Sequence, residues 1–298
     1  MNRARGVGLF APSGFALDPT AIDRAAARLT AMGRNVTIDP TCHGREMRFA
    51  ASDDERLAAV RRMAANPEVD LAIALRGGYG LTRLLSQLDF GALAASGTRW
   101  LGYSDFTAFH LAALARGGMV SFAGPVVSDF GAREPSAFTL DHCFGVLDHA
   151  SYEVACPLDG PDLACTGTLW GGNLALVTHL VDTPYFPAVD GGILFLEDVG
   201  EVPYRIERML YQLLHAGVLA HQRAILLGHF TEYALSANDG GYDFDVVVRQ
   251  LRGACATPIC TGLPFGHVPD KLTLPVGGRC NLVVRDGAAR LSFSDYGH

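Results

Sequence analysis

The chain has 298 residues, which is enough for two domains with separate hydrophobic cores. Hydrophobic residues make up 49% of the chain and charged residues 18%, a composition that is typical of folded proteins and argues against a disordered chain. The net charge of -7 is spread along the chain without a basic stripe, so the composition argues against nucleic acid as a partner.

The first half of the sequence alternates short apolar runs with amphipathic segments. Strands are predicted at residues 7–11, 35–38, 71–75, 100–103 and 119–122. Asp18 and Pro19 predict the start of a first helix, and Ser52 with Glu55 predicts the capping box of a second. Continuous apolar strands separated by helices predict a parallel sheet covered on both faces, as in Rossmann-like and flavodoxin-like folds. Ligands of such sheets bind beyond the carboxyl ends of the strands.

The pattern changes after residue 151. The segment 152–165 contains two prolines, two aspartates and a glycine with little periodicity, and we interpret it as a linker. Beyond it we predict strands at 167–170, 193–196 and 224–227, helices from 173 and over 204–216, and finally short β pieces with a hairpin turn at Asp286-Gly287. The sequence therefore predicts an α/β protein with an N-terminal parallel-sheet domain over 1–151 and a smaller, mixed α/β C-terminal domain over 166–298.

The seven cysteines predict neither a disulfide framework nor a zinc site. Their number is odd, Cys-x-x-Cys does not occur, and Cys255 and Cys260 have no second pair to accompany them. Reduced thiols in a cytoplasmic protein are therefore expected.

The N-terminus imitates a signal peptide, because Arg3 and Arg5 precede an apolar run over 6–17. The residues at 12–14, Pro-Ser-Gly, interrupt this run, so we predict no signal peptide. No stretch approaches the roughly 18 apolar residues of a transmembrane helix, so we also predict no membrane span.

The single lysine narrows the classes of enzyme. Lys271 is followed by Leu272, which excludes a P-loop, and Val268 stands three residues before it, which excludes the Ser-x-x-Lys motif of penicillin-binding enzymes. An enzyme that holds its cofactor as a Schiff base would need a buried lysine amine. We predict neither a cofactor nor a metal ion.

A serine on a strand-to-helix turn is the first candidate for chemistry. Ser104 follows the strand at 100–103 and precedes a helix that is predicted to run to Arg116. Its hydroxyl would project at the top of the sheet, near free amides of the helix start that could stabilise an oxyanion. The turn resembles a nucleophile elbow, although Phe106 stands where the second glycine would be. The alternative is a serine that only caps the helix.

A glycine-rich loop is the second candidate. Arg76-Gly77-Gly78-Tyr79-Gly80 follows the strand at 71–75, and its glycines would let backbone amides approach a ligand or an oxyanion. The loop lacks the Gly-x-Gly-x-x-Gly fingerprint of dinucleotide sites, and an ordinary tight turn is the alternative.

An acid and an imidazole complete the set of candidates. Glu197 and Asp198 directly follow the strand predicted at 193–196, and a carboxylate at this strand end could orient a base or cap the next helix. His267 ends the rigid turn Gly262-Leu263-Pro264-Phe265-Gly266-His267, whereas His110 lies inside a predicted helix. The order Ser, Glu, His is that of α/β-hydrolases, although such triads are recognised by geometry.

Together these segments resemble a known family, the LD-carboxypeptidases (muramoyltetrapeptide carboxypeptidases, peptidase family S66). The motifs that carry the resemblance are Ala11-Pro12-Ser13-Gly14, Gly171-Gly172-Asn173 and the segments 76–80, 102–105, 196–208 and 262–267. They span nearly the whole chain in the family's order. The resemblance implies that Ser104 is the nucleophile, Glu197 the acid and His267 the base of a catalytic triad.

Members of this family cleave the L,D-peptide bond between a diamino acid and terminal D-alanine in murein tetrapeptides, during cytoplasmic cell-wall recycling, and they are often dimers. The resemblance therefore implies a murein peptide substrate and a possible homodimer. We expect the amides of Asp105 and Gly78 to receive the oxyanion and Arg76 to bind the terminal carboxylate. Because Ser104 lies in the first predicted domain and the other two triad residues lie in the second, the site is expected between the domains.

Other functions stay open at this point. A related branch hydrolyses microcin-type peptidyl nucleotides, but its members tend to carry longer loops, and the compact spacing from Asn173 to Glu197 favours the recycling branch. A catalytically silent peptide-binding module is a second alternative, against which the intact Ser104, Glu197 and His267 argue. A nucleotide-dependent enzyme that uses the loop 76–80 is a third, against which the missing fingerprint and the single lysine argue.

Overall fold

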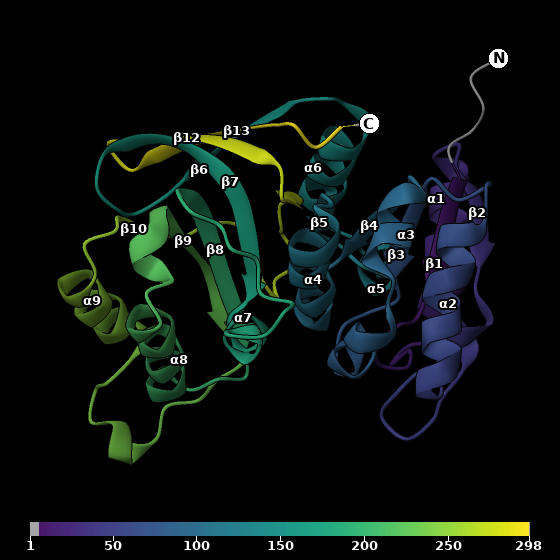
Figure 1. Ribbon diagram of the computed structural model, residues 1–298. Helices are drawn as coiled ribbons and strands as arrows, with labels where there is room; N and C mark the ends of the chain where they lie inside the picture. Colours follow the sequence, from purple (N-terminus) through teal and green to yellow (C-terminus); the bar gives the residue numbers. More distant parts are fainter. Residues whose placement is uncertain (1–5, 298) are drawn as a thin grey trace.

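The computed structural model describes residues 6–297 and contains two β-sheets that lie side by side (Figure 1). Arg3 and Arg5, the basic residues of the segment that imitates a signal peptide, lie outside the described residues. The strand orders are β11-β5-β4-β3-β1-β2 in the first sheet and β10-β9-β8-β7-β12-β13-β6 in the second.

The first sheet confirms the predicted parallel strands of the N-terminal half. Its parallel members are β1 (Gly6–Phe10), β2 (Asn35–Ile38), β3 (Leu71–Ala74), β4 (Arg99–Gly102) and β5 (Ser121–Ala123). The sixth strand, β11 (Leu274–Val276), pairs antiparallel to β5 and comes from the C-terminal part of the chain. β11 therefore completes the edge of the first sheet, although it comes from the segment 166–298 that was predicted as the C-terminal domain.

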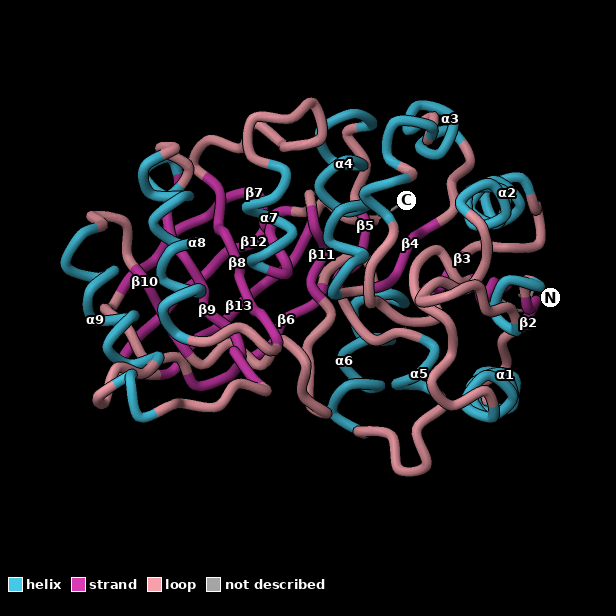
Figure 2. Tube along the Cα trace, turned by 90° about the horizontal axis from the view of Figure 1, so that it is seen from below, coloured by secondary structure: helices cyan, strands magenta, loops and turns pink. Residues whose placement is uncertain are grey.

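Helices cover both faces of the first sheet, as the alternation of apolar and amphipathic segments predicts. They are α1 (Thr20–Ala31), α2 (Asp53–Ala65), α3 (Phe90–Ala95), α4 (Thr107–Gly117), α5 (Val127–Phe130) and α6 (Ala137–Asp148). In Figure 2, α2, α3 and α4 lie on one side of the strands, and α1, α5 and α6 on the other. Ser52 caps α2, since its hydroxyl accepts a hydrogen bond from the Glu55 amide at 3.3 Å. Asp18 accepts one from the Thr20 amide at 3.0 Å, but the residue directly before α1 is Pro19, which provides no side-chain cap.

The second sheet is mixed. Its parallel half consists of β7 (Leu163–Asn173), β8 (Gly192–Val199), β9 (Gln222–Thr231) and β10 (Ile259–Thr261), and its antiparallel half of β12 (Arg279–Arg285), β13 (Ala288–Ser294) and β6 (Tyr152–Pro157). The helices α7 (Leu174–Leu180), α8 (Pro203–His215) and α9 (Phe244–Ala254) pack one against the next. Asp286 and Gly287 have φ of 49° and 76°, the left-handed values of a two-residue hairpin turn, which confirms the predicted turn between β12 and β13.

The predicted linker over 152–165 is not an irregular crossing. Its first part is β6, in which Val154 and Cys156 are buried and alternate with exposed residues, and its last residues begin β7. Pro157 ends β6, and Pro161 and the two aspartates stand between the two strands. Their turn signal was therefore correct, but the period-2 pattern before them was missed. The division into domains at 151 and 166 stays a prediction.

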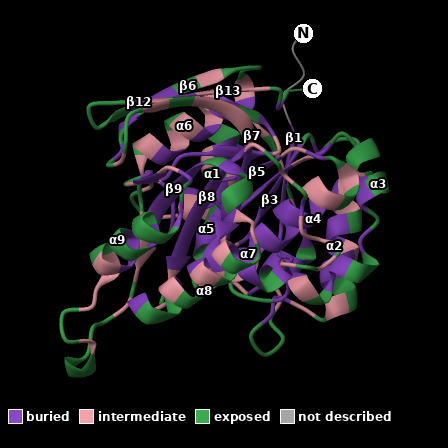
Figure 3. Cartoon of the chain, turned by 60° about the vertical axis from the view of Figure 1, so that its left-hand side comes forward, coloured by how far each residue is buried: buried purple, intermediate pink, exposed green. Residues whose placement is uncertain are grey.

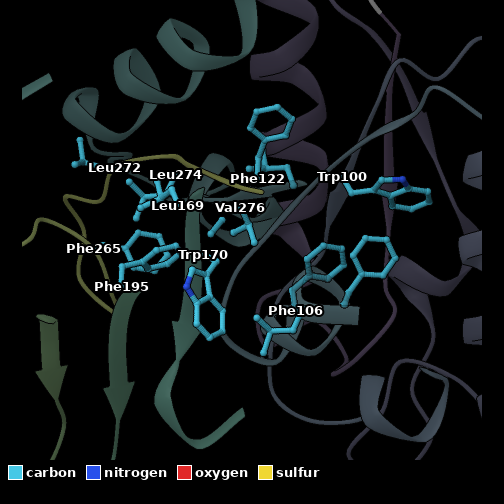
Figure 4. Packing of buried hydrophobic residues seen from close by; sticks show 14 of the residues in the cluster. Trp100, Phe106, Phe122, Leu169, Trp170, Phe195, Phe265, Leu272, Leu274 and Val276 are labelled. Atoms are coloured by element: carbon cyan, nitrogen blue, oxygen red, sulfur yellow. The ribbon is translucent and has the colours of Figure 1, made fainter. Parts of the chain in front are cut away.

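One continuous core joins the two sheets. Trp100 packs against Phe10 and Phe109 with ring centroids 5.6 and 5.2 Å apart, and Phe195 packs edge-on against Phe265 at 5.2 Å. Leu169, Leu274 and Val276 lie between these aromatic groups (Figure 4). The central strands β1, β3, β8 and β9 are mostly buried, while β6, β12 and β13 and the outward faces of the helices include exposed residues (Figure 3). This shared core fixes the carboxyl ends of strands from one sheet relative to those of the other.

Candidate active site

Ser104 lies at the strand end where the sequence places it, in a strained backbone conformation. Its φ is 64°, a left-handed value that costs a residue other than glycine roughly 1–2 kcal/mol. A short 3-10 helix, Ser104–Phe106, follows directly and leads into α4. The turn is held from inside the protein by His110, whose Nε2 lies 2.9 Å from the Gly102 carbonyl oxygen and whose Nδ1 lies 2.8 Å from the Ser121 hydroxyl.

His110 acts as a structural residue. Complete burial lowers its pKa to about 4, so the imidazole is neutral at neutral pH. Because a carbonyl oxygen can only accept, Nε2 donates to Gly102 and Nδ1 accepts from Ser121. This agrees with the expectation that His110 is packed rather than reactive.

His267 connects the serine to a buried carboxylate. Its Nε2 lies 3.0 Å from the Ser104 Oγ, and its Nδ1 lies 2.8 Å from the Glu197 Oε2. Glu197 is completely buried at the end of β8. In this arrangement Nδ1–H can donate to the carboxylate while Nε2 accepts the serine proton, which is the geometry that general-base activation of a hydroxyl requires.

The path of the chain explains how a residue of the second half reaches Ser104. His267 stands on the segment that leaves β10 in the second sheet and enters β11 in the first. Backbone hydrogen bonds from His229 N to Phe265 O and from Leu272 N to Pro264 O, both 2.8 Å, fix this segment. Gly266 has a φ of 139°, and a Cβ there would lie 2.9 Å from the His229 carbonyl oxygen, so the turn before His267 requires glycine.

Behind Glu197 lies a second buried carboxylate. Asn173 donates from Nδ2 to Glu197 Oε1 at 3.3 Å and to Asp198 Oδ1 at 2.8 Å. Asp198 also accepts from the amides of Val199 and Ala175 at 2.8 and 2.9 Å. Burial raises the pKa of Asp198 to about 6, although these donors favour the charged form.

The motif Gly171-Gly172-Asn173 joins the two halves of the site. The Asn173 amide donates to the Thr107 hydroxyl at the start of α4, at 3.0 Å. A Cβ at Gly172, whose φ is 139°, would lie 2.4 Å from that same hydroxyl oxygen. The end of β7 can therefore approach α4 this closely only with glycine at this position.

The glycine loop after β3 lies against Ser104. A Cβ at Gly77 would stand 2.7 Å from the Ser104 Oγ and 3.2 Å from the Asp105 amide nitrogen. Gly78 has a φ of 113°, and a Cβ there would lie nearest to atoms of Arg76 and Gly14. The structure thus places Gly77 directly beside the hydroxyl, with Gly78 following it.

Asp105 ties three loops together. Its Oδ2 accepts from the Ser13 hydroxyl at 2.6 Å and from the Leu81 amide at 3.0 Å, so the carboxylate joins the loops after β1, β3 and β4. Burial raises its pKa, and the bond from Ser13 is the largest effect that opposes this. The motif Ala11-Pro12-Ser13-Gly14 therefore contributes through Ser13 to the position of the serine turn.

Arg76 lies beside the same loops. Its Nη1 donates to the Phe15 carbonyl at 3.4 Å, and within residues 6–297 it pairs with no carboxylate. Burial lowers its pKa. It lines a cavity of about 240 Å³, and His267 lines a neighbouring one of about 380 Å³; Ser128 and Ala132 border both.

A larger cavity, of about 750 Å³, lies elsewhere in the protein. It is lined by Trp170, Phe186 and Gln222 among others, and by none of the predicted site residues. Over residues 6–297, no three His, Cys, Asp or Glu side chains gather in a way that could hold a metal ion. None of the helices in this range is both long and apolar enough to cross a membrane.

Comparison with known proteins decides the family. The model of the LD-carboxypeptidase N-terminal domain matches residues 7–124, and that of the LD-carboxypeptidase C-terminal domain matches residues 166–282. The chain belongs to the LD-carboxypeptidase family. It is therefore a peptidase by family.

Relatives of this LD-carboxypeptidase include a probable murein peptide carboxypeptidase of Bacillus subtilis, 30% identical, with 94% of this chain and 89% of the relative covered. A murein tetrapeptide carboxypeptidase of Pseudomonas aeruginosa is also 30% identical, with 91% of each chain covered. The crystal structure of a muramoyltetrapeptide carboxypeptidase from Oxalobacter formigenes is 46% identical, with a TM-score of 0.92 over 98% of this chain and 100% of that one.

A more distant neighbour of this LD-carboxypeptidase is the microcin C7 self immunity protein MccF. Its wild-type apo structure is 21% identical, with a TM-score of 0.88 over 100% of this chain and 98% of that one. At this level of identity the likeness shows a shared fold and no more.

The sequence did not indicate which residues support the chain of hydrogen bonds from Ser104 to Glu197. The support comes from Asn173 behind Glu197, Thr107 across from β7 and His110 behind the serine turn. The sequence did indicate a structural role for Asn173, since an asparagine after two glycines at the start of a helix is a typical cap. Its Oδ1 accepts a hydrogen bond from the Leu176 amide at 3.2 Å. Thr107 carried none, because its partner Asn173 is distant in the sequence. His110 carried none, because its partners Gly102 and Ser121 lie on neighbouring strands that only the fold places around the helix.

Proposed function

We propose that the protein is a serine carboxypeptidase that hydrolyses the L,D-peptide bond to terminal D-alanine in murein tetrapeptides, as part of cell-wall recycling. The observation that carries the proposal is the hydrogen-bonded chain from Ser104 through His267 to the buried Glu197. The names of the relatives from Pseudomonas aeruginosa and Oxalobacter formigenes support the substrate.

The proposed reaction proceeds in two steps. Ser104 Oγ attacks the carbonyl carbon of the scissile bond while His267 Nε2 takes the serine proton. His267 then gives this proton to the nitrogen of D-alanine, the C–N bond breaks, and the tripeptide is left as an ester on Ser104. A water molecule, deprotonated by His267, hydrolyses the ester and restores the serine. Glu197 holds the imidazole in the required tautomer and stabilises its charged form.

The amides of Asp105 and Gly78 are proposed to receive the oxyanion. A Cβ at Gly77 would lie close to both Ser104 and the Asp105 amide, and the next amide along the chain is that of Gly78. This proximity supports an oxyanion site formed by this part of the loop. Removal of one such donor typically costs about 3–4 kcal/mol in the barrier.

Arg76 is proposed to bind the terminal carboxylate of the substrate. It is half-buried, lacks a carboxylate partner within the described residues, and lies in a cavity next to the one that His267 lines. A guanidinium group binds a carboxylate with two parallel hydrogen bonds, which suits a peptidase that acts at a free C-terminus.

The location and assembly follow from the same proposal. All seven cysteines are free thiols, which supports a cytoplasmic protein. A homodimer is proposed from the family resemblance, and light scattering coupled to size-exclusion chromatography tests it: a mass near twice 31.8 kDa is expected, and a mass near 31.8 kDa would contradict it.

Product analysis on two substrates tests the function. The purified protein is incubated in parallel with a murein tetrapeptide and with a microcin-type peptidyl nucleotide. We expect release of D-alanine from the tetrapeptide and no cleavage of the peptidyl nucleotide. The reverse result would assign the protein to the microcin branch, and cleavage of neither would favour a peptide-binding module.

A further inference from the structure

The only lysine of the chain is buried in the wall of the cavity that adjoins His267. Lys271 has a side chain that is 2% exposed, and its Nζ lies 2.8 Å from Asp129 Oδ1. The second oxygen of Asp129 accepts from the Val126 amide at 2.9 Å. The backbone of Lys271 is fixed as well, because its amide donates to the Thr139 hydroxyl of α6 at 2.8 Å.

The ammonium group of Lys271 also contacts an aromatic ring. Nζ lies 4.8 Å from the centroid of the Tyr103 ring, within the range of a cation–π interaction. The Tyr103 ring in turn lies 5.0 Å from the imidazole of His267, at an angle of 56°. Tyr103 directly precedes Ser104, so one ring links the lysine, the imidazole and the serine turn.

Stability alone does not account for this lysine. Burying the ammonium of Lys271 costs desolvation that its attraction to the partly exposed carboxylate of Asp129 scarcely recovers, and an apolar residue of similar size often stabilises a protein as well or better. Burial also raises the pKa of Tyr103 well above its usual value, so the tyrosine is neutral and meets the ammonium through its ring. The pair therefore suggests a role in the position of Tyr103.

The imidazole of His267 needs such a support. Its hydrogen bond to Glu197 fixes Nδ1, but the ring can still turn about that bond and move Nε2 away from Ser104. A ring packed beside the imidazole restricts this motion. A displacement of about 1 Å at a reacting group can cost roughly 100-fold in rate.

We propose that Tyr103 and Lys271 are positioning residues: Tyr103 keeps the His267 imidazole aligned with Ser104, and Lys271, held by Asp129, keeps the Tyr103 ring in place. This inference rests on the serine mechanism proposed above and goes beyond it, since neither residue contacts a reacting atom.

The first test separates the ring from the hydroxyl of Tyr103. Tyr103→Leu removes the ring, and Tyr103→Phe keeps it. We expect Tyr103→Leu to lower kcat on the tetrapeptide by roughly 10- to 100-fold with KM changed less than about twofold, and Tyr103→Phe to recover most of the rate. Rates are compared on the plateau of each variant's pH profile, so that differences in the protonation of the enzyme do not contribute.

The second test concerns Lys271. Lys271→Met alone leaves Asp129 as an unpaired charge and can fail to fold, so the double variant Lys271→Met/Asp129→Asn is measured beside it. The double variant should melt near the wild type yet show a loss of kcat similar in size to that of Tyr103→Leu. A double variant and a Tyr103→Leu variant that both keep full kcat would overturn the proposal. A rise in KM at unchanged kcat would also overturn it, because that is the mark of a substrate contact.

Labelling with a fluorophosphonate, which reacts with activated serines, distinguishes this inference from the proposed function. The rate of labelling at Ser104 needs no peptide substrate, and it should fall in Tyr103→Leu and in the double variant as kcat does. If the wild type is labelled at Ser104 but does not cleave the tetrapeptide, the substrate assignment fails while the labelling rates still test the positioning. If Ser104 of the wild type is not labelled, the serine mechanism fails, and the inference fails with it.

Discussion

Three carboxylates stand close together in the segment from Glu197 to Glu201, and their contacts separate them. Glu197 is completely buried and bonds to His267, and Asp198 is 3% exposed and bonds to Asn173 and two backbone amides. Glu201 forms a surface ion pair with Arg205 at 3.6 Å. Only one of the three can orient the imidazole.

Glu197→Gln should therefore lower kcat by roughly 100-fold or more, because the amide cannot stabilise the charged imidazole and presents a donor to Nδ1. Asp198→Asn is expected to lower kcat by less than about tenfold, and Glu201→Gln to leave it nearly unchanged. Steady-state kinetics on the tetrapeptide with all three variants shows which carboxylate orients the imidazole. A larger loss at Asp198 would mean that the acid has been assigned to the wrong residue.

Asp198 should instead be visible in the pH dependence of stability. Its pKa is about 6 in the folded protein against 3.8 for a free side chain, so the folded state binds the proton more tightly. The stabilising contribution of Asp198 to the free energy of unfolding is fully present below pH 3.8 and is lost as the pH rises to about 6. This loss amounts to about 3 kcal/mol at most. Asp198→Asn removes this loss.

Denaturant unfolding of the wild type and of Asp198→Asn, at pH 4 and at pH 7, measures the effect. The free energy of unfolding of the variant relative to the wild type should rise between the two pH values. A constant difference would show that Asp198 titrates normally in the folded protein.

At the level of single residues, the sequence allowed Ser104, Glu197 and His267 to be singled out because each stands at the end of a predicted strand or turn. Their order and the motifs around them then suggested one site. Asp105 was predicted only for its backbone amide, whereas its carboxylate joins Ser13 and Leu81. That role depends on contacts between residues far apart in the chain, which no local pattern records.

At the level of elements, the site consists of loops at the carboxyl ends of parallel strands. The loops after β1, β3 and β4 meet at Asp105, and the ends of β7 and β8 supply Asn173 and Glu197. Among these approaches, that of the loop after β3 to the candidate nucleophile is made by Gly77.

Gly77→Ala should therefore impair activity without unfolding the protein. The new methyl group would lie 2.6 Å from the Ser104 Cβ, so the loop or the serine must shift. We expect kcat to fall by roughly 10- to 100-fold, as for other displacements of about 1 Å. Gly253→Ala is the matched control, because its added Cβ meets nothing within 4 Å in α9. Equal activity of the two variants would show that the loop after β3 does not constrain Ser104.

Most strands and helices could be predicted from periodicity and caps, because those signals are local. The strands β6 and β11 could not be placed in this way. The alternating pattern of β6 was overlooked because of the prolines at its end and in the loop after it. β11 is a short segment that pairs with β5, more than a hundred residues earlier. Pairing partners at such distances are set by the shared core and not by the segment's own pattern.

At the level of the whole molecule, the site depends on how the two sheets are joined. The segment between β10 and β11 carries His267 from one sheet to the other, and Arg76 lies on the side of the first sheet. A substrate that ends beside Ser104 would place its terminal carboxylate within this junction.

A peptide with a free C-terminus should therefore be preferred over its amide. If Arg76 binds the carboxylate, the amide leaves a half-buried guanidinium unpaired, which costs several kcal/mol and lowers kcat/KM by orders of magnitude. Arg76→Ala should lose this discrimination, whereas the control Arg249→Ala on α9 should keep it. Equal rates on acid and amide would contradict the carboxypeptidase assignment, and discrimination that survives Arg76→Ala would contradict only the choice of arginine.

The release of D-alanine by Ser104→Ala shows whether Ser104 is the nucleophile. The side chain stands on a turn outside the core, so the variant should fold and melt like the wild type. Its kcat on the murein tetrapeptide should fall to less than about one-hundredth of the wild-type value. A folded Ser104→Ala that still releases D-alanine above this level would contradict the account.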